Sequence, residues 1–198
     1  MYLPVGIQAT SAERILTTAL DQFATKGYDA TSVREICEAA GITKPTLYHF
    51  FGSKDGVLQA LVHTGFQQYR ALVNAAMDTP GSFQDRVTVL ARAVFASASS
   101  KPLFWRFIHS VIWAPPGTAL PQTENCTQFY DGVVGVLAAA ADKAVARGEI
   151  APGPTGARML ILMGAISEAA TGFVIAGKPE LTPELADDIV DTIFNGWQ

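Results

Sequence analysis

The feature that most constrains the fold of this chain is the spacing of its apolar residues, which recur three and four positions apart along almost its whole length. Such spacing gives each segment one apolar stripe at the period of an α-helix. Runs that alternate apolar and polar residues, as half-buried strands do, never appear, and no Asn-Gly or Asp-Gly pair lies between two such runs. The sequence therefore predicts an all-α fold.

Capping residues, glycines and prolines divide the chain into about nine predicted helices. Thr10 and Glu13 form a capping-box pair before the first helix, and Gly27 follows its end. Thr43 is the expected N-cap of the third helix. The predicted helices cover about 12–26, 32–40, 43–51, 54–77, 83–100, 103–113, 121–147, 159–177 and 183–197.

Composition excludes several classes of protein. With 49% hydrophobic and 16% charged residues, the chain is too apolar for disorder. Cys37 and Cys126 lie far apart without a partner at metal-ligand spacing, so we expect neither a disulfide framework nor a metal site. Because no basic segment followed by an apolar core opens the chain, we expect a cytoplasmic protein. Signatures such as GxSxG, GxGxxG, Walker A and HExxH are absent, so we expect neither an enzyme nor a bound cofactor.

The segment over 159–177 is long and apolar enough to suggest a membrane span. Glu168 lies at its centre, however, where a carboxylate costs about 2.5 kcal/mol or more in a bilayer. Because no aromatic belt or asymmetry of basic loops frames the segment, we expect a helix that protein buries on all sides, and no membrane partner. A carboxylate so buried would need an arginine, a dimer partner or a ligand amine.

The stretch over 31–54 is the most informative part of the chain. Two segments, each too short to be a stable helix alone, are joined by a turn at Gly41, which is the arrangement of a helix-turn-helix. We expect the first predicted helix to complete a three-helix core with Ile36, Leu47 and either Phe50 or Phe51.

Polar residues off the apolar face of the second short helix suit the major groove of double-stranded DNA. Lys44 can reach guanine O6 and N7, threonines can bond bases or phosphates, and Pro45 can touch the methyl group of thymine. Tyr48 and His49 can donate to phosphates, and Lys54 lies at a helix N-terminus, which favours an anion. The candidate DNA-binding residues are Thr31, Ser32, Arg34, Thr43, Lys44, Pro45, Thr46, Tyr48, His49 and Lys54.

Positive charge around this motif is sparse. The whole chain has a net charge of −4, and residues 1–56 hold five basic against six acidic residues. After Glu38 no acidic residue occurs up to Lys54, and this stretch holds two lysines, Lys44 and Lys54. We therefore expect few phosphate ion pairs, much neutral hydrogen bonding, and a dimer that doubles the contacts.

The runs FATKGYDATSVREI and GITKPTLYHFFGSKD resemble the tetracycline-repressor (TetR/AcrR) family of transcription regulators. The resemblance covers about 12–61, and the rest of the chain is similar only in length, helical character and helix order. It implies a helix-turn-helix DNA-binding domain over 1–52 and a ligand-binding and dimerisation domain over 53–198. It also implies a homodimeric repressor that binds a palindromic operator. Phe50 departs from the pattern, which often has histidine or another polar residue there, so we expect one possible phosphate contact to be absent.

The last two predicted helices carry small residues that allow close helix approach, followed by bulky apolar ones. They can form a four-helix interface between two subunits, or they can be core of one subunit only. The candidate interface residues are Ala165, Ala169, Gly172, Ile189, Ile193, Phe194 and Trp197.

The aromatic-rich stretch over 103–113 is the candidate wall of a pocket, because its rings cannot all point one way on a helix. We expect this pocket to take a small, largely apolar effector, although plain packing is the alternative for each residue. A helical module that binds a protein or small molecule without DNA is the alternative function. The candidate pocket residues are Phe66, Phe104, Trp105, Phe107, His109, Trp113, Tyr130, Met163, Glu168 and Phe173.

Overall fold

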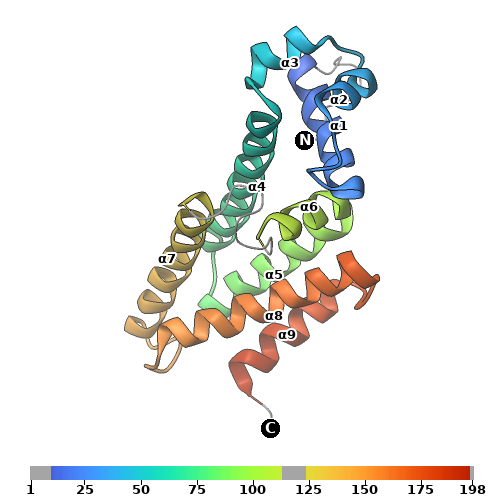
Figure 1. Ribbon diagram of the computed structural model, residues 1–198. Coiled ribbons are helices and arrows are strands. Elements are labelled where there is room, and N and C mark those ends of the chain that lie inside the picture. The colour runs from blue at the N-terminus through green and yellow to red at the C-terminus, as the bar shows by residue number, and fades with distance from the viewer. Residues whose placement is uncertain (1–9, 113–123, 197–198) are drawn as a thin grey trace. The chain divides into compact units, whose positions relative to one another are not determined.

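The structure is a computed structural model that describes residues 10–112 and 124–196, with the side chains of 124–130 outside the description. Within these ranges all regular structure is α-helical, which confirms the predicted fold class (Figure 1). The helices are α1 (Ser11–Lys26), α2 (Val33–Ala40), α3 (Lys44–Phe51), α4 (Lys54–Met77), α5 (Phe83–Ser100), α6 (Pro102–Ile112), α7 (Glu124–Ala146), α8 (Thr155–Ala176) and α9 (Pro183–Asn195).

Several helices begin where local sequence dictates. The Thr10 hydroxyl accepts the Glu13 backbone N–H, and the Glu13 carboxylate accepts the Thr10 N–H, which completes the expected capping box of α1. Ser32 with Glu35 and Ser82 with Asp85 repeat this arrangement at α2 and α5. These caps satisfy backbone donors that would otherwise lack partners, so each start is fixed by residues three apart.

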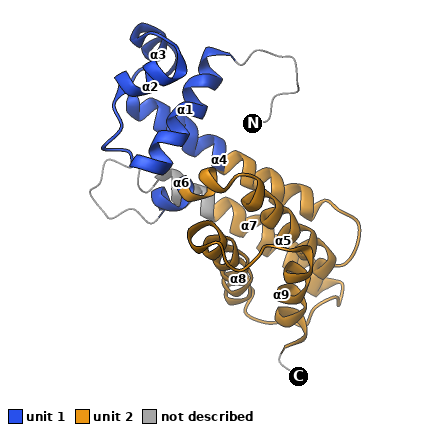
Figure 2. Cartoon of the chain, turned by 90° about the vertical axis from the view of Figure 1, so that its right-hand side faces the viewer, with its two compact units in different colours: residues 1–65, 107–122 blue, residues 66–106, 123–198 orange. Residues whose placement is uncertain are grey.

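The chain divides into two compact units (Figure 2). Unit 1 contains residues 1–65 and 107–122, and unit 2 contains residues 66–106 and 123–198. Among the described residues the structural division therefore falls inside α4 and inside α6, and a further crossing between 122 and 123 lies outside them. The boundary between a DNA-binding domain over 1–52 and a ligand-binding domain over 53–198 stays a prediction.

In unit 1, helices α1, α2 and α3 pack against one another in pairs. Ile15, Ile36 and Leu47, one from each helix, are each 0% exposed. Phe51 is half-buried whereas Phe50 is 48% exposed, so of these two phenylalanines only Phe51 contributes to the core. The expected three-helix arrangement is therefore present.

In unit 2, α5 is the central helix, because α7, α8 and α9 all pack against it. Its residues Leu90, Val94 and Phe95 are at most 2% exposed. Leu162 of α8 and Val190 of α9 belong to the same buried cluster. Unit 2 therefore has one continuous apolar core that several helices share.

The structure corrects the expectation that α8 is buried on all sides. One face, which includes Leu162 and Ile166, is buried in unit 2, but Leu160, Ile161 and Ile175 are 61%, 59% and 69% exposed. Glu168 is exposed as well, so its carboxylate pays no burial cost in the single subunit. By length and composition alone α8 could cross a membrane, but the core helix of a soluble protein can pass the same test.

Candidate nucleic-acid interface and cavity

A tight turn at Gly41 sets the directions of α2 and α3. Gly41 has a φ of 63°, which glycine adopts without steric cost. Its N–H donates to the carbonyl of Glu38 at 3.3 Å, and the next N–H, of Ile42, donates to Cys37 at 3.0 Å. These bonds close the end of α2, and α3 begins three residues after Gly41.

The buried and exposed residues of α3 divide as predicted. Leu47 is fully buried, whereas Lys44, Pro45 and His49 are exposed and Tyr48 is 49% exposed. The exposed side chains supply a cation, donors, an acceptor and an apolar ring on one short helix. This combination can contact both base edges and phosphates.

The two threonines at the start of α3 bond each other. Thr43 is the N-cap by position, but its hydroxyl makes no cap hydrogen bond and lies 2.9 Å from the Thr46 hydroxyl. Because each hydroxyl can donate once and accept twice, the pair keeps the capacity to bond an outside group.

The candidate residues at the start of α2 differ in what they can offer. Thr31 is 1% exposed and its hydroxyl donates to the Gly27 carbonyl at 2.8 Å, so this side chain is used inside unit 1 and not at the surface. Ser32 is exposed but caps α2, and its bonds lower the pKa of Glu35 to about 2. Arg34 is exposed and paired with Glu38 at 2.6 Å, an exposed pair that is weak enough to exchange for another anion.

Lys54 is bonded inside unit 1, in contrast to the predicted phosphate contact. Its Nζ donates to the carbonyls of Tyr28 and Thr31, at 2.9 Å each, and lies 4.1 Å from the centre of the Tyr28 ring. The Tyr28 hydroxyl donates to the Asp55 carboxylate. Burial, followed by this hydrogen bond, raises the pKa of Tyr28. The start of α4 is thereby tied to the segment between α1 and α2.

The candidate interface residues mostly pack within unit 2. Ile189, Ile193 and Phe194 lie against its core. Gly172 faces the chain after α8, and a Cβ there would lie 2.6 Å from the Lys178 carbonyl oxygen, so its lack of a side chain is needed inside the subunit. Ala165 and Ala169 are half-buried, and Trp197 lies outside the described residues. Sequence reasoning missed the exposed apolar residues of α8.

The candidate pocket residues are divided between the two units. Phe107, stacked on Phe23 at 6.2 Å, and half-buried His109 belong to unit 1. The others that the structure describes belong to unit 2. There the Trp105 indole donates to Ser97 at 3.2 Å. The remaining positions are Phe66, buried; Phe104, Met163 and Phe173, half-buried; Glu168, exposed; and Trp113 and the Tyr130 side chain, outside the described residues.

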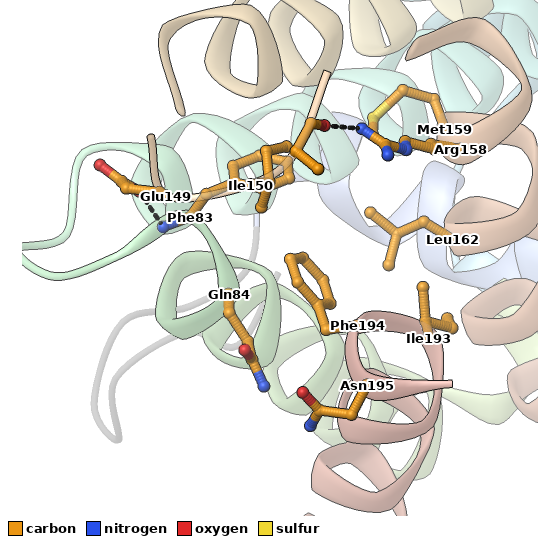
Figure 3. Close-up of a pocket in the computed structure, with 11 residues that line it drawn as sticks. Phe83, Gln84, Glu149, Ile150, Arg158, Met159, Leu162, Ile193, Phe194 and Asn195 are labelled. Carbon is orange, nitrogen blue, oxygen red and sulfur yellow. Dashed lines mark hydrogen bonds between the residues drawn. The ribbon is translucent and has the colours of Figure 1, made fainter. Parts of the chain in front are cut away.

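A cavity of about 340 Å³ lies elsewhere in unit 2, and none of the candidate pocket residues lines it. It is formed by the start of α5, the segment between α7 and α8, the first turns of α8 and the end of α9 (Figure 3). Its apolar lining residues are Phe83, Ile150, Met159, Leu162, Ile193 and Phe194.

Charged and amide side chains lie around these apolar walls. Arg158 donates to the Ala151 carbonyl at 2.5 Å, and Glu149 accepts the Phe83 N–H at 2.7 Å (Figure 3). Gln84 and Asn195 lie at the other end of the cavity from Arg158 (Figure 3). The cavity thus combines an apolar middle with polar groups at its ends.

Comparison with known proteins finds relatives for the N-terminal part of the chain. Residues 15–61 match the family described as bacterial regulatory proteins, tetR family. The chain is 33% identical over 129 residues to the HTH-type transcriptional repressor KstR2 of Rhodococcus jostii, which covers 63% of this chain and 62% of that protein. It is 28% identical over 98 residues to the HTH-type transcriptional regulator BetI of Rhizobium meliloti, and this match covers 50% of this chain and 48% of that protein. The matches thus span less than two thirds of these relatives.

Solved structures share the fold over nearly the whole chain. The fatty acid degradation regulator FadR of Bacillus halodurans superposes with a TM-score of 0.80 at 17% identity, covering 97% of this chain and 98% of that one. FadR of Bacillus subtilis, solved in complex with stearoyl-CoA, superposes with a TM-score of 0.79 at 18% identity. This match covers 93% of this chain and 98% of that one. The segment over residues 15–61 is thus that of the tetR family of bacterial regulatory proteins, and the chain shares its all-helical fold with solved regulators.

Proposed function

We propose that this protein is a cytoplasmic transcriptional repressor that binds a palindromic operator as a homodimer and is released by a small, largely apolar effector. The observation that carries the proposal is the exposed face of α3, where Lys44, Pro45, Tyr48 and His49 surround the buried Leu47. A helix with one buried anchor and a polar, accessible face is what a major groove accepts. That the relative KstR2 is a transcriptional repressor supports repression over activation.

In the proposed complex, residues 1–52 bind DNA and α3 enters the major groove. Lys44 reads a guanine and Pro45 contacts a thymine methyl group, while Tyr48 and His49 hold phosphates. Thr43 and Thr46 act as a bonded pair that offers one further donor. Ser32 and Arg34 contact the backbone from the start of α2. Thr31 and Lys54 shape the domain from inside and contribute no direct contact.

The proposed dimer uses the exposed face of α8. In the single subunit this face exposes three large apolar side chains to water, those of Leu160, Ile161 and Ile175. Covering them with the same face of a second subunit would remove this surface from water and give a symmetric contact. Two DNA-binding domains in one dimer would then match a palindrome.

Release by an effector follows from a shift between two populations. Free dimer favours a spacing of the recognition helices that matches successive major grooves, about 34–36 Å apart. An effector that binds residues 53–198 better at another spacing lowers DNA affinity by that difference alone. We propose α4 as the lever, because it runs from the DNA-binding helices into unit 2. The stearoyl-CoA bound by the FadR structure supports regulation by a small molecule.

The test is selection of DNA fragments by the purified protein from a random pool, followed by affinity measurements on the selected sequence. The selected sequence is expected to be palindromic and to bind one dimer. Lys44→Ala should then reduce discrimination at particular base pairs by about 1–3 kcal/mol. Lys143→Ala, an exposed lysine on α7, is the matched control and should change nothing. Failure to enrich any sequence would overturn the proposal.

A further inference from the structure

We propose that the cavity of unit 2 binds a small carboxylate with an aromatic or alicyclic body, anchored by Arg158. The binding of such a ligand can be tested without the proposed function. Only its role as the effector rests on the proposed function. The proposal depends on the charge balance around the cavity, on the shape of its walls and on its size.

Arg158 supplies the anchor. It is half-buried in the first turn of α8, and within the described residues its guanidinium donates one hydrogen bond, to the Ala151 carbonyl. No carboxylate among the residues that the structure describes lies within ion-pair distance of it. Because a guanidinium has five N–H donors, four remain. A carboxylate can take two of them in the parallel geometry that arginine favours.

Glu149, the carboxylate in the cavity lining, does not neutralise Arg158. One oxygen accepts the Phe83 backbone N–H at 2.7 Å, and the other lies 2.9 Å from Nε of Arg147. The negative charge of Glu149 is therefore balanced by a different arginine. Arg158 remains the charge that a ligand can meet.

The walls favour a ring as the apolar body. The rings of Phe83 and Phe194 lie 5.9 Å apart at 53° to each other, and Phe194 is directed into the cavity (Figure 3). Tilted aromatic edges stabilise another ring placed against them. Met159 and Leu162, each 2% exposed, complete an apolar middle against which such a ring can pack.

The volume limits the ligand to a small molecule. About 340 Å³ lies at the low end of the range of small-molecule sites, roughly 300–1,000 Å³. One ring with a short chain to the carboxylate fits this space. Such a ligand would contact α5, α8 and α9 together, and it would raise the temperature at which unit 2 unfolds.

The experiment is calorimetric titration of the full chain, without DNA, using 3-phenylpropanoate and 3-phenylpropanamide. The two probes share a body and differ in charge. We expect the carboxylate to bind the wild-type chain at least about ten-fold more tightly than the amide. Arg158→Met should remove this preference, because methionine keeps an apolar stem but no donors. Arg70→Met, which removes an exposed arginine of α4 outside the lining, should keep it.

Equal binding of the two probes to the wild-type chain would overturn the proposal, and so would no binding of either. Undiminished carboxylate binding by folded Arg158→Met would overturn it as well. The comparison of acid and amide needs no variant, so it decides the matter even if Arg158→Met fails to fold. A carboxylate that binds here without releasing DNA would refute only the effector role.

Discussion

Lys54 offers the sharpest test of how the DNA-binding helices are held. Lys54→Met keeps the apolar stem and removes the ammonium group. That group makes two hydrogen bonds to backbone carbonyls at 2.9 Å and a contact with the Tyr28 ring. Hydrogen bonds to charged groups contribute about 1.5–3 kcal/mol each. Because Lys54 is only half-buried, we take the lower value for each bond and expect the free energy of unfolding to fall by about 3 kcal/mol in total.

The assay is denaturant unfolding followed by circular dichroism, with thermal unfolding beside it. A loss of about 3 kcal/mol corresponds to a fall in Tm of roughly 6–12 °C for a chain of this size. Lys44→Met is the matched control, since Lys44 is exposed on α3. Its free energy of unfolding should stay within about 0.5 kcal/mol of wild type.

The salt dependence of DNA binding separates the structural role from a phosphate contact. A lysine that neutralises a phosphate adds about 0.9 to the slope of log affinity against log salt concentration. Because the Lys54 amine is bonded inside unit 1, the slope should be unchanged in the folded Lys54→Met variant. Wild-type stability together with a slope lowered by about 0.9 per subunit would refute the structural role.

Three further predictions concern α8. Ile161→Asp should dissociate the proposed dimer while the subunit stays folded, because it adds a charge to a face that only a partner would bury. Sedimentation that finds an intact dimer would place the interface elsewhere. Glu168→Gln should tighten the proposed dimer, because it removes a charge that lies seven residues after Ile161 on the same helix and is exposed in the single subunit. It should leave effector affinity unchanged, because Glu168 is outside the cavity; a weaker effector response with the same dimer affinity would contradict this. Gly172→Ala should lower the free energy of unfolding by about 1–3 kcal/mol, because its Cβ would meet the Lys178 carbonyl; Gly164→Ala, with nothing within 4 Å, is the control in the same denaturation experiment.

Most of the fold could be predicted from sequence because its determinants are local. Helix starts depend on pairs three residues apart, such as Thr10 with Glu13, and the buried side of α3 follows from Leu47. Where a helix is apolar on every side, as α8 is, no periodicity remains to tell its buried face from its exposed one. The outward position of Glu168 therefore needed the structure.

The cavity and the bonds of Lys54 could not be predicted for a different reason. The cavity brings together Phe83, Glu149, Arg158 and Phe194, which lie far apart in the chain. No spacing in the sequence encodes that meeting, because it depends on how α5, α8 and α9 pack. The Lys54 amine likewise reaches carbonyls more than twenty residues away, and backbone carbonyls leave no residue-specific signal.

The continuity of α4 has a consequence for how this chain can vary. Among the described residues, the division between the two units cuts α4 between residues 65 and 66 and α6 between 106 and 107, so at these two crossings no loop separates the units; the third crossing, between 122 and 123, lies outside the described residues. One residue inserted near Gly65 would turn the rest of α4 by about 100° about its axis. Recombination that joins a new unit 2 to an existing unit 1 must therefore keep the helical phase, so this boundary tolerates substitutions far better than insertions or deletions.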